Sequence, residues 1–447
     1  MGITMRIILY ILAISLLASC SGTKKTSRSK TMAKPKKKKT SSRTAQKARG
    51  AMDTISWTEI DKSKDYYETI QDLDLEKRSS YKIKVFFPFS LKDTDLGQST
   101  DNDTNLGRMT QFYSGMLMAI EQLESEGMSL NIQVMDAESG NFDSKLQSCR
   151  DADVIIGPMD FDQLAVTANF GKNNDIPVIS PWRTHSKLSK DNPYLVQLIP
   201  GQVDHYDKII TEVKSKFQDK EICLLGRNKS LDKKYFAYMQ RVAASINNDN
   251  NKRPLNEFVI DEDSLLTGET AFDSIFVENE TFVGILPHWS FENDSEFVYN
   301  AVRKLSAERG FNKVILYGMP ILLDSDRITF EHYFNLNMRI CRSAYVDKTL
   351  PAVQEFRKKY YNNYKNLPTD SAYEGHDVMM LVGRHLFNYG KKFQFFMEDY
   401  DANLLQTRYD IQKVFKKNDD DQFKDIQYFQ NKHLYILTFE NNQFVAK

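Results

Sequence analysis

Asp153-Val154-Ile155-Ile156-Gly157-Pro158 is a short apolar run that stops at a Gly-Pro turn, and Ile176-Pro177-Val178-Ile179-Ser180 is a second run of the same kind. Each has the length and β-branched composition of a strand buried on both faces. Residues 161–172, between the two runs, are long enough for the helix that must connect parallel strands. The stretch from 153 to 180 therefore predicts a strand–helix–strand unit of a parallel sheet.

The same alternation continues on both sides of this unit. Upstream, the pattern predicts a strand at 85–89, a helix at 108–127 and a strand at 132–135. Helical patterns also separate most of the downstream strands, which are predicted at 194–199, 222–225, 258–260, 282–286, 314–317 and 343–346. Such alternation predicts an α/β fold with parallel sheets covered by helices on both faces. The roughly 365 residues from Tyr81 onward exceed what one core usually holds, so two lobes are expected.

The first 20 residues have the pattern of a bacterial secretion signal. One positive charge, Arg6, precedes an apolar run at 7–17, and small residues come before Cys20. That run is about half as long as a membrane-spanning helix. The ending Leu17-Ala18-Ser19-Cys20 resembles the lipobox of bacterial lipoproteins, which implies that 1–19 is a signal peptide and that Cys20 is acylated, for example with palmitate. An ordinary signal peptide with an incidental cysteine is the alternative.

Residues 20–80 are expected to be a lipidated cysteine followed by a basic, disordered tether. Residues 21–50 contain twelve Lys or Arg and no acidic residue. Arg6 is the other basic residue of the first 50, so residues 51–447 hold 47 basic and 60 acidic residues. Dense like charges favour disorder. Residues 24–49 then serve either as a plain spacer or as a contact with cell wall or anionic lipid.

The expected location is the cell envelope. No acidic residue directly follows Cys20, which favours an outer-membrane anchor facing the periplasm, while an inner-membrane or surface location stays open. Nucleic acid is not an expected partner outside the cytoplasm.

The sequence gives no sign of an enzyme, a cofactor or a metal site. It has no hydrolase, metalloprotease or phosphate-binding motif. Asp101-x-Asp103-x-Asn105 begins like a calcium loop, but the Gly and the bidentate Glu that such a loop needs are missing. Beyond Cys20, the odd number of cysteines argues against a disulfide scaffold, with a Cys223–Cys341 bridge left open.

Five segments resemble, in order and spacing, the type I periplasmic binding proteins of the leucine/isoleucine/valine-binding branch. They are 82–89, 112–120, 154–158, 176–181 and Tyr373-Glu374-Gly375-His376-Asp377, which opens an apolar helix. The whole chain also resembles lipoproteins of Bacteroidetes-type bacteria that carry this fold. The resemblance implies two α/β lobes joined by three crossovers, with a ligand between them.

These crossovers divide the chain into four stretches. We assign lobe 1 to 81–199 and 345–392, and lobe 2 to 200–344 and 393–447. Within the last stretch, 434–445 is predicted to be a hairpin that turns on Asn441-Asn442.

A ligand of an open parallel sheet lies beyond the carboxyl ends of the strands. This rule and the resemblance select the candidate ligand-binding residues Pro158, Met159, Asp160, Phe161, Ser180, Trp182, Arg183, Thr184, His288, Trp289, Glu292, Met319 and Tyr373. The resemblance implies that hydroxyls such as that of Thr184 bind a carboxylate in amino-acid-like ligands. Trp182 and Arg183 fill positions that are usually small in the family. Structural roles are the alternatives: lobe packing for Trp182, a salt-bridged rim for Arg183 and a satisfied buried ring for His288.

Two functions from different classes fit these observations. The first is a lipoprotein that binds or senses a small polar ligand between two lobes. The alternative is a non-transport interaction or scaffold protein in cell-envelope or peptidoglycan-synthesis regulation. The fold alone does not decide between them. An open pocket with convergent polar groups favours the first function, and a filled interface favours the second.

Overall fold

The computed structural model describes residues 77–446, with gaps at 90–104, 139, 183–184, 186–187, 189–190, 247–253, 278–279, 400–401 and 416–425. The predicted signal peptide, Cys20, residues 21–76 of the predicted tether and the acidic segment with Asp101 lie outside the described residues, as do the candidates Arg183 and Thr184. Within the described part, no helix has the length and apolar character needed to cross a membrane.

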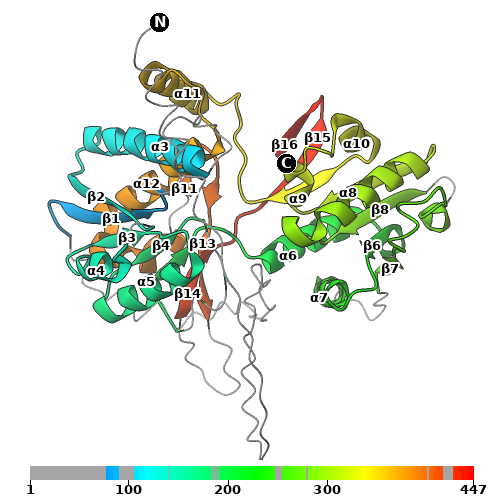
Figure 1. The fold of residues 1–447 in the computed structure, drawn as a ribbon, viewed down its shortest axis with the longest axis horizontal. Helices are drawn as coiled ribbons and strands as arrows, with labels where there is room; N and C mark the ends of the chain where they lie inside the picture. Colours follow the sequence, from blue (N-terminus) through cyan, green and yellow to red (C-terminus); the bar gives the residue numbers. More distant parts are fainter. Residues whose placement is uncertain are drawn as a thin grey trace, which may run out of the picture. The chain divides into compact units, whose positions relative to one another are not determined.

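The first lobe is built on a seven-stranded sheet (Figure 1). Its strands, in spatial order, are β13 (Ile411–Phe415), β14 (Ile426–Asn431), β5 (Leu195–Gln197), β4 (Val178–Ser180), β3 (Val154–Ile156), β1 (Tyr81–Phe87) and β2 (Leu130–Asp136). All neighbours pair in parallel except β13 with β14. The strand–helix–strand unit predicted at 153–180 is therefore present, with α5 (Phe161–Asn174) between β3 and β4.

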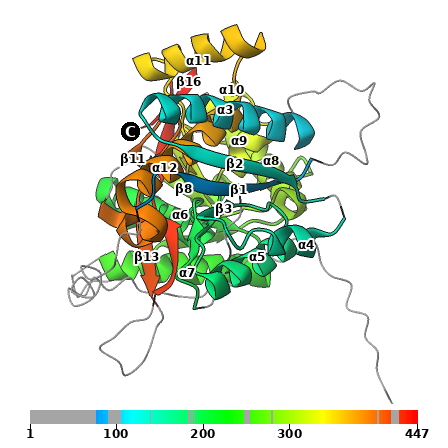
Figure 2. The same ribbon diagram turned by 90° about the vertical axis from the view of Figure 1, so that its left-hand side faces the viewer.

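Helices cover both faces of this sheet because β1 presents apolar side chains to both. Ile83, Val85 and Phe87 pack toward α3 (Asn105–Ser125) and α12 (Asp370–Tyr389). Phe86 packs toward α4 (Phe142–Gln147) and α5 on the other face (Figure 2). The remaining elements of the lobe are α11 (Pro351–Tyr364), the 3-10 segment η5 (Gly390–Asp399) and the short pair β11 (Ala402–Asn403) and β12 (Arg408–Tyr409).

Two glycines allow α3 and α12 to pack closely. A side chain at Gly375 of α12 would collide with the backbone carbonyl of Phe112, and one at Gly115 of α3 would collide with that of Ala372. Only the lack of Cβ atoms permits this approach. Gly375, in the segment that resembles the binding-protein family, therefore has a helix-packing role here.

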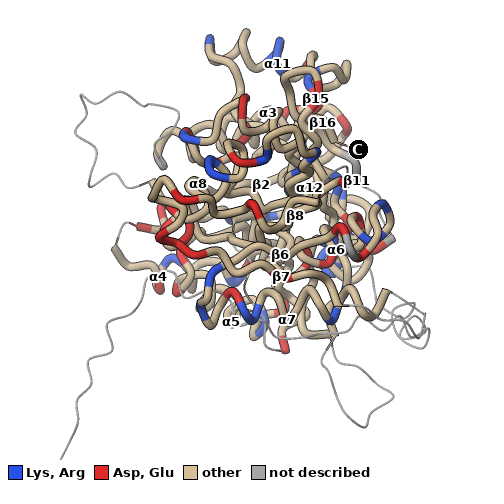
Figure 3. Tube along the Cα trace, turned by 90° about the vertical axis from the view of Figure 1, so that its right-hand side faces the viewer, with Lys and Arg blue, Asp and Glu red and all other residues tan. Residues whose placement is uncertain are grey.

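The second lobe also has a seven-stranded sheet. Its strands, in spatial order, are β16 (Gln443–Ala446), β15 (Tyr435–Glu440), β10 (Arg339–Arg342), β9 (Lys313–Gly318), β8 (Thr281–Leu286), β6 (Ile222–Gly226) and β7 (Asn256–Val259). Its helical segments are α6 (Gln202–Lys216), η3 (Asp219–Glu221), α7 (Ser230–Ile246), η4 (Asp273–Ile275), α8 (Phe291–Glu308), α9 (Ile321–Asp324) and α10 (Phe330–Asn335). Acidic and basic residues are both distributed along the described chain trace (Figure 3).

The structure corrects the predicted division of the last stretch. Residues 393–447 were assigned to lobe 2, but β13 and β14 belong to the first sheet, where Phe429 pairs with Val196 of β5. Phe429 is fully buried in the core around β1, so burial of an apolar strand decides its place. The chain crosses between the sheets at 198–201, 343–350 and 432–434, so the third crossover comes about 40 residues later than predicted.

Two further local predictions can be compared with the structure. The hairpin at the end of the chain is confirmed: β15 and β16 pair antiparallel, and Asn441 and Asn442 turn with φ of 51° and 61°. The strand predicted at 343–346 is wrong, because the strand is β10 at Arg339–Arg342, where Ile340 and Cys341 are fully buried between two arginines. Cys341, Cys223 and Cys149 are buried free thiols, so Cys223 and Cys341 are not bridged.

Candidate functional site

Most of the candidate residues in the loop after β3 have structural roles. Pro158 is buried and follows a cis peptide bond with Gly157. Asp160 caps α5 by accepting a 2.9 Å hydrogen bond from the backbone N–H of Gln163. Phe161 packs edge-on against His185, with ring centroids 5.1 Å apart. Of the four candidates in this loop, only the partly buried Met159 packs into the same apolar cluster as Trp182.

The loop after β4 places Trp182 against the lobe's own core. Its ring lies 4.9 Å from that of Phe112 and 5.9 Å from that of Phe87. Among the described residues, no hydrogen-bond partner is found for the buried indole Nε1. Ser180 is buried at the end of β4. Trp182 thus has the packing role that was the alternative to ligand stacking.

In the second lobe, His288 belongs to a closed network of buried charges at the ends of β6 and β8. Its Nε2 lies 2.8 Å from Oδ2 of Asp232, which also accepts from the guanidinium of Arg227. Arg227 donates a further 2.6 Å bond to Asp294. Burial raises the pKa of Asp232, but the hydrogen bonds from His288 and Arg227 lower it more, so that it lies well below its usual range. Paired buried charges of this kind indicate a structural role.

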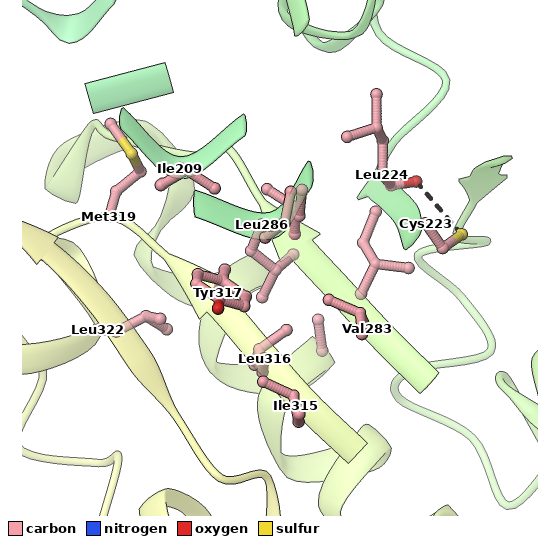
Figure 4. Close-up of a cluster of buried hydrophobic side chains, with 14 of the residues drawn as sticks. Ile209, Cys223, Leu224, Val283, Leu286, Ile315, Leu316, Tyr317, Met319 and Leu322 are labelled. Carbon is pink, nitrogen blue, oxygen red and sulfur yellow. Dashed lines mark hydrogen bonds between the residues drawn. The ribbon is translucent and has the colours of Figure 1, made fainter. Parts of the chain in front are cut away.

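The other candidates of the second lobe and α12 are dispersed. Trp289 packs edge-on against the buried His205, and Glu292 is exposed in the first turn of α8. Met319 is fully buried in the core of the second sheet (Figure 4). Tyr373 is buried against Phe356 of α11, with ring centroids 5.1 Å apart. These described candidates therefore lie in separate environments, while Arg183 and Thr184 fall outside the described residues.

The cavity that the structure does form at the crossovers is lined mostly by residues that sequence reasoning missed. This hinge pocket has a volume of about 190 Å³. Pro181 contributes from the β4 loop, and Leu198 and Ile199 from the first crossover. The second crossover, the start of α12 and the segment before β13 supply the rest, namely Arg342, Ser343, Ala344, Asp370, Ser371, Glu374, Val378, Gln406, Thr407 and Tyr409.

The charged residues of the hinge pocket are two acids, Asp370 and Glu374, and one base, Arg342. Arg342 of β10 forms a 3.1 Å ion pair with Asp370. Burial raises the pKa of the half-buried Glu374 to about 8, and the carboxylates of Asp370 and Asp377 add to this effect while Arg342 opposes it. A carboxyl group whose pKa lies near neutral pH, beside a second carboxylate, suits a ligand with a positive charge or with hydrogen-bond donors.

Hydrogen bonds hold the walls of the hinge pocket in place. The hydroxyl of Thr407 donates to the carbonyl of Ser343 at 2.7 Å, and the N–H of Tyr345 donates to the carbonyl of Gln406 at 2.8 Å. A larger cavity of about 460 Å³ adjoins the hinge pocket and shares Arg342, Ala344, Asp370 and Gln406 with it. Among the described residues, no cluster of three or more His, Cys, Asp or Glu side chains could hold a metal ion.

Part of this site carried a sequence signal. Glu374 lies in the Tyr373-Glu374-Gly375 segment, next to the tyrosine that was selected. Arg342 carried none, because the strand that it ends was predicted four residues too late. Gln406 and Thr407 precede a two-residue strand that leaves no recognisable pattern.

The comparisons with known proteins agree with this architecture. No protein-family model matches the sequence, and no curated protein sequence gives a match. A solved structure from Rhodospirillum rubrum, described as a branched-chain amino acid ABC transporter protein, matches with a TM-score of 0.55, 12% identity, and coverage of 82% of this chain and 100% of that one. An ABC transporter substrate-binding protein from Desulfitobacterium hafniense matches with a TM-score of 0.51, 12% identity and the same coverage.

Full-length LpoA from Haemophilus influenzae matches more weakly, with a TM-score of 0.48, 11% identity, and coverage of 83% of this chain and 59% of that one. That similarity is too low to inform function. The two neighbours named above with TM-scores over 0.5 are described as an ABC transporter protein and a substrate-binding protein, and neither is described as an enzyme. Two mostly parallel sheets flanked by helices, three crossovers and these matches show that the chain has the two-lobed fold of the type I periplasmic binding proteins.

Proposed function

We propose that the protein is an envelope lipoprotein that binds or senses a small polar solute in the hinge pocket. The observation that carries this proposal is the convergence of Asp370, Ser371, Glu374 and Arg342 on one cavity at the crossovers. A few polar groups converging in a concave site are typical of small-molecule binding sites. The fold supports the proposal because its solved neighbours include substrate-binding proteins of ABC transporters.

The chemistry of the pocket narrows the ligand class. Arg342 is already paired with Asp370, so Glu374 is the acidic group that is open to a ligand. A cationic group on the ligand would favour the ionised form of Glu374 and would be neutralised by it. We therefore propose a ligand that carries an amine or a comparable cation, with amino-acid-like ligands included.

The anchor and the location rest on the sequence. The ending Leu17-Ala18-Ser19-Cys20 supports acylation of Cys20, and the basic stretch 24–49 supports contact with anionic lipid or cell wall. We propose the outer membrane, facing the periplasm, as the location.

One observation favours the alternative of an interaction protein. On α10, the side chains of Phe330 and Phe334 are 65% and 72% exposed. The ring of Phe330 packs on Phe439 of β15, next to the edge strand β16. Exposed aromatic side chains beside a free sheet edge are typical of protein-binding surfaces.

Mass spectrometry of the natively purified full-length protein tests the proposal. Denaturation should release a stoichiometric small cationic or zwitterionic molecule. Retitration of that molecule should show an affinity at least about tenfold weaker for Glu374→Gln, in line with the loss of a charged hydrogen-bond partner. Glu269→Gln, at an exposed position outside the pocket, is the matched control. Recovery of an envelope protein in place of any small molecule would favour the interaction function.

A further inference from the structure

A third cavity lies within the first lobe, away from the residues of the hinge pocket. One face each of α3, α11 and α12, together with Leu404 and Leu405, encloses a volume of about 500 Å³. We refer to this cavity as the helix groove. Its volume falls in the range of small-molecule sites. None of the roles described above uses it.

The floor of the helix groove is apolar and adaptable. Met118 of α3, Phe356 of α11 and Met380 of α12 line the cavity, and each is at most 6% exposed. Thioether side chains adjust to irregular shapes and make favourable contacts with aromatic rings. Phe356 adds a ring that can pack edge-on or offset against another aromatic group. An aromatic body is therefore the ligand part that fits this floor.

The floor also offers one fixed polar group. His376 lines the groove, is 6% exposed, and has its Nδ1 3.1 Å from Oδ1 of Asp377. A carboxylate only accepts hydrogen bonds, so Nδ1 donates, and in the neutral ring Nε2 is an acceptor. The Asp377 carboxylate is itself held by the backbone N–H groups of Leu405 and Gln406. The imidazole is thus oriented to accept a hydrogen bond from a ligand.

The charges at the rim leave one acid in excess. Lys359 is paired with Glu121 at 3.1 Å, and Arg384 is paired with Glu126 at 2.8 Å. Glu355 of α11 also lines the groove and has no ion pair among the described residues. With both cations neutralised by their own partners, Glu355 makes the rim selective for a positive charge.

We propose that the helix groove is a binding site for an aromatic amine, distinct from the hinge pocket. The aromatic ring packs on Met118, Met380 and Phe356. The ammonium group donates a hydrogen bond to Nε2 of His376 and faces the carboxylate of Glu355. The site does not depend on the solute-binding proposal, because the two cavities share no lining residue.

Calorimetric titration of the full-length protein with tryptamine tests the ligand class. Tryptamine combines an indole ring with a primary ammonium group and should bind saturably at one site. Indole-3-propionate has the same ring with a negative charge, and n-butylamine has the charge without a ring, so each should bind at least about tenfold more weakly, as expected for the loss of roughly 1.4 kcal/mol. A lack of saturable tryptamine binding, or equal binding of indole-3-propionate, would overturn the proposal.

Variants on the exposed surface of α11 locate the site without disturbing the core. Ala352 is exposed and lines the groove, so Ala352→Trp should fill the cavity and abolish tryptamine binding. Gln354→Trp, at an exposed position on the same helix outside the groove, should bind like the wild type.

Glu355→Gln should weaken binding about two- to fivefold, as expected for an exposed charge pair, and the exposed Glu124→Gln should not. Tryptamine binding that survives Ala352→Trp but is lost in Glu374→Gln would assign the ligand to the hinge pocket and refute the groove.

Discussion

The carboxylate of Asp377 in α12 accepts a 2.7 Å hydrogen bond from the backbone N–H of Gln406. The same buried carboxylate accepts from the N–H of Leu405 at 3.0 Å. Gln406 and Thr407 are in turn hydrogen-bonded to the second crossover. Asp377 therefore fixes the segment 405–407, which separates the hinge pocket from the helix groove. One side chain therefore connects a helix of lobe 1 to the segment that joins the lobes.

Asp377→Asn should loosen this wall. The amide keeps the size of the side chain but replaces one acceptor oxygen with a donor, so buried backbone N–H groups lose their partner. We expect the free energy of unfolding to fall by about 2–4 kcal/mol, as for a lost hydrogen bond to a buried charged group. Hydrogen exchange should accelerate at the amides of Leu405 and Gln406 more than in β1. Unchanged protection at those two amides would show that Asp377 does not hold the segment.

The buried network around Asp232 should make the second lobe sensitive to acid. The folded-state pKa of Asp232 is lowered because hydrogen bonds from His288 and Arg227 outweigh the effect of burial. Its contribution to stability is therefore fully present above the unfolded-state pKa of about 4 and is lost as the pH falls toward the folded-state value.

Asp232→Asn should cost about 3–5 kcal/mol at neutral pH, since it leaves Arg227 buried without its main partner. The difference between wild type and variant should shrink as the pH falls below about 4. Urea unfolding from pH 7 to pH 3 measures both effects, with the exposed Asp273→Asn as control. A difference that is constant over this range would contradict the assigned ionisation.

Sequence patterns predicted the parts of the fold that depend on local burial. The runs at 154–156 and 178–180 are short, rich in β-branched residues and buried throughout, which is typical of strands inside a sheet covered on both faces. The place of β14 could not be predicted in the same way, because its partner β5 lies more than 200 residues away and both lobes offer a sheet edge. Register between distant strands is a tertiary property that local pattern does not contain.

The candidate site was less predictable than the fold, for a related reason. His288 was selected by its position after a strand, but its role depends on Asp232, 56 residues earlier in the chain. Met319 also follows a strand and is nevertheless fully buried. The rule for strand ends identifies loops correctly, but whether a side chain there faces a cavity is decided by partners from other elements. Arg342 and Asp370 meet only because β10 and α12 converge at the second crossover.

Acylation of Cys20 should control how the protein partitions between membrane and aqueous phases. Cys20→Ala removes the thiol directly after Leu17-Ala18-Ser19, and the protein should move from the detergent phase to the aqueous phase in detergent phase separation. Labelling with a palmitate analogue should be lost at the same time. Cys149→Ala, which alters a buried thiol in lobe 1, should leave both readouts unchanged. Retention of the Cys20→Ala variant in the membrane fraction at low salt but not at high salt would assign the anchor to the basic stretch 24–49.

Glu374 should make the stability of lobe 1 depend on pH in the opposite sense to Asp232. Burial, with Asp370 and Asp377 nearby, raises its pKa from 4.5 to about 8, so the folded state binds a proton more tightly than the unfolded state. Stability should therefore decrease as the pH rises from about 4.5 to about 8 and then level off. Glu374→Gln imitates the neutral carboxyl and should be more stable than the wild type at pH 8.5 by about 1 kcal/mol, after allowance for partial exposure, and nearly equal to it at pH 4.5. Urea unfolding at the two pH values measures the difference, and equal stability at both would show that Glu374 titrates normally.

If the hinge pocket binds a cation, binding of the ligand recovered from the native protein should release protons near pH 7. Calorimetry in two buffers of different ionisation enthalpy detects this release, and Glu374→Gln should abolish it.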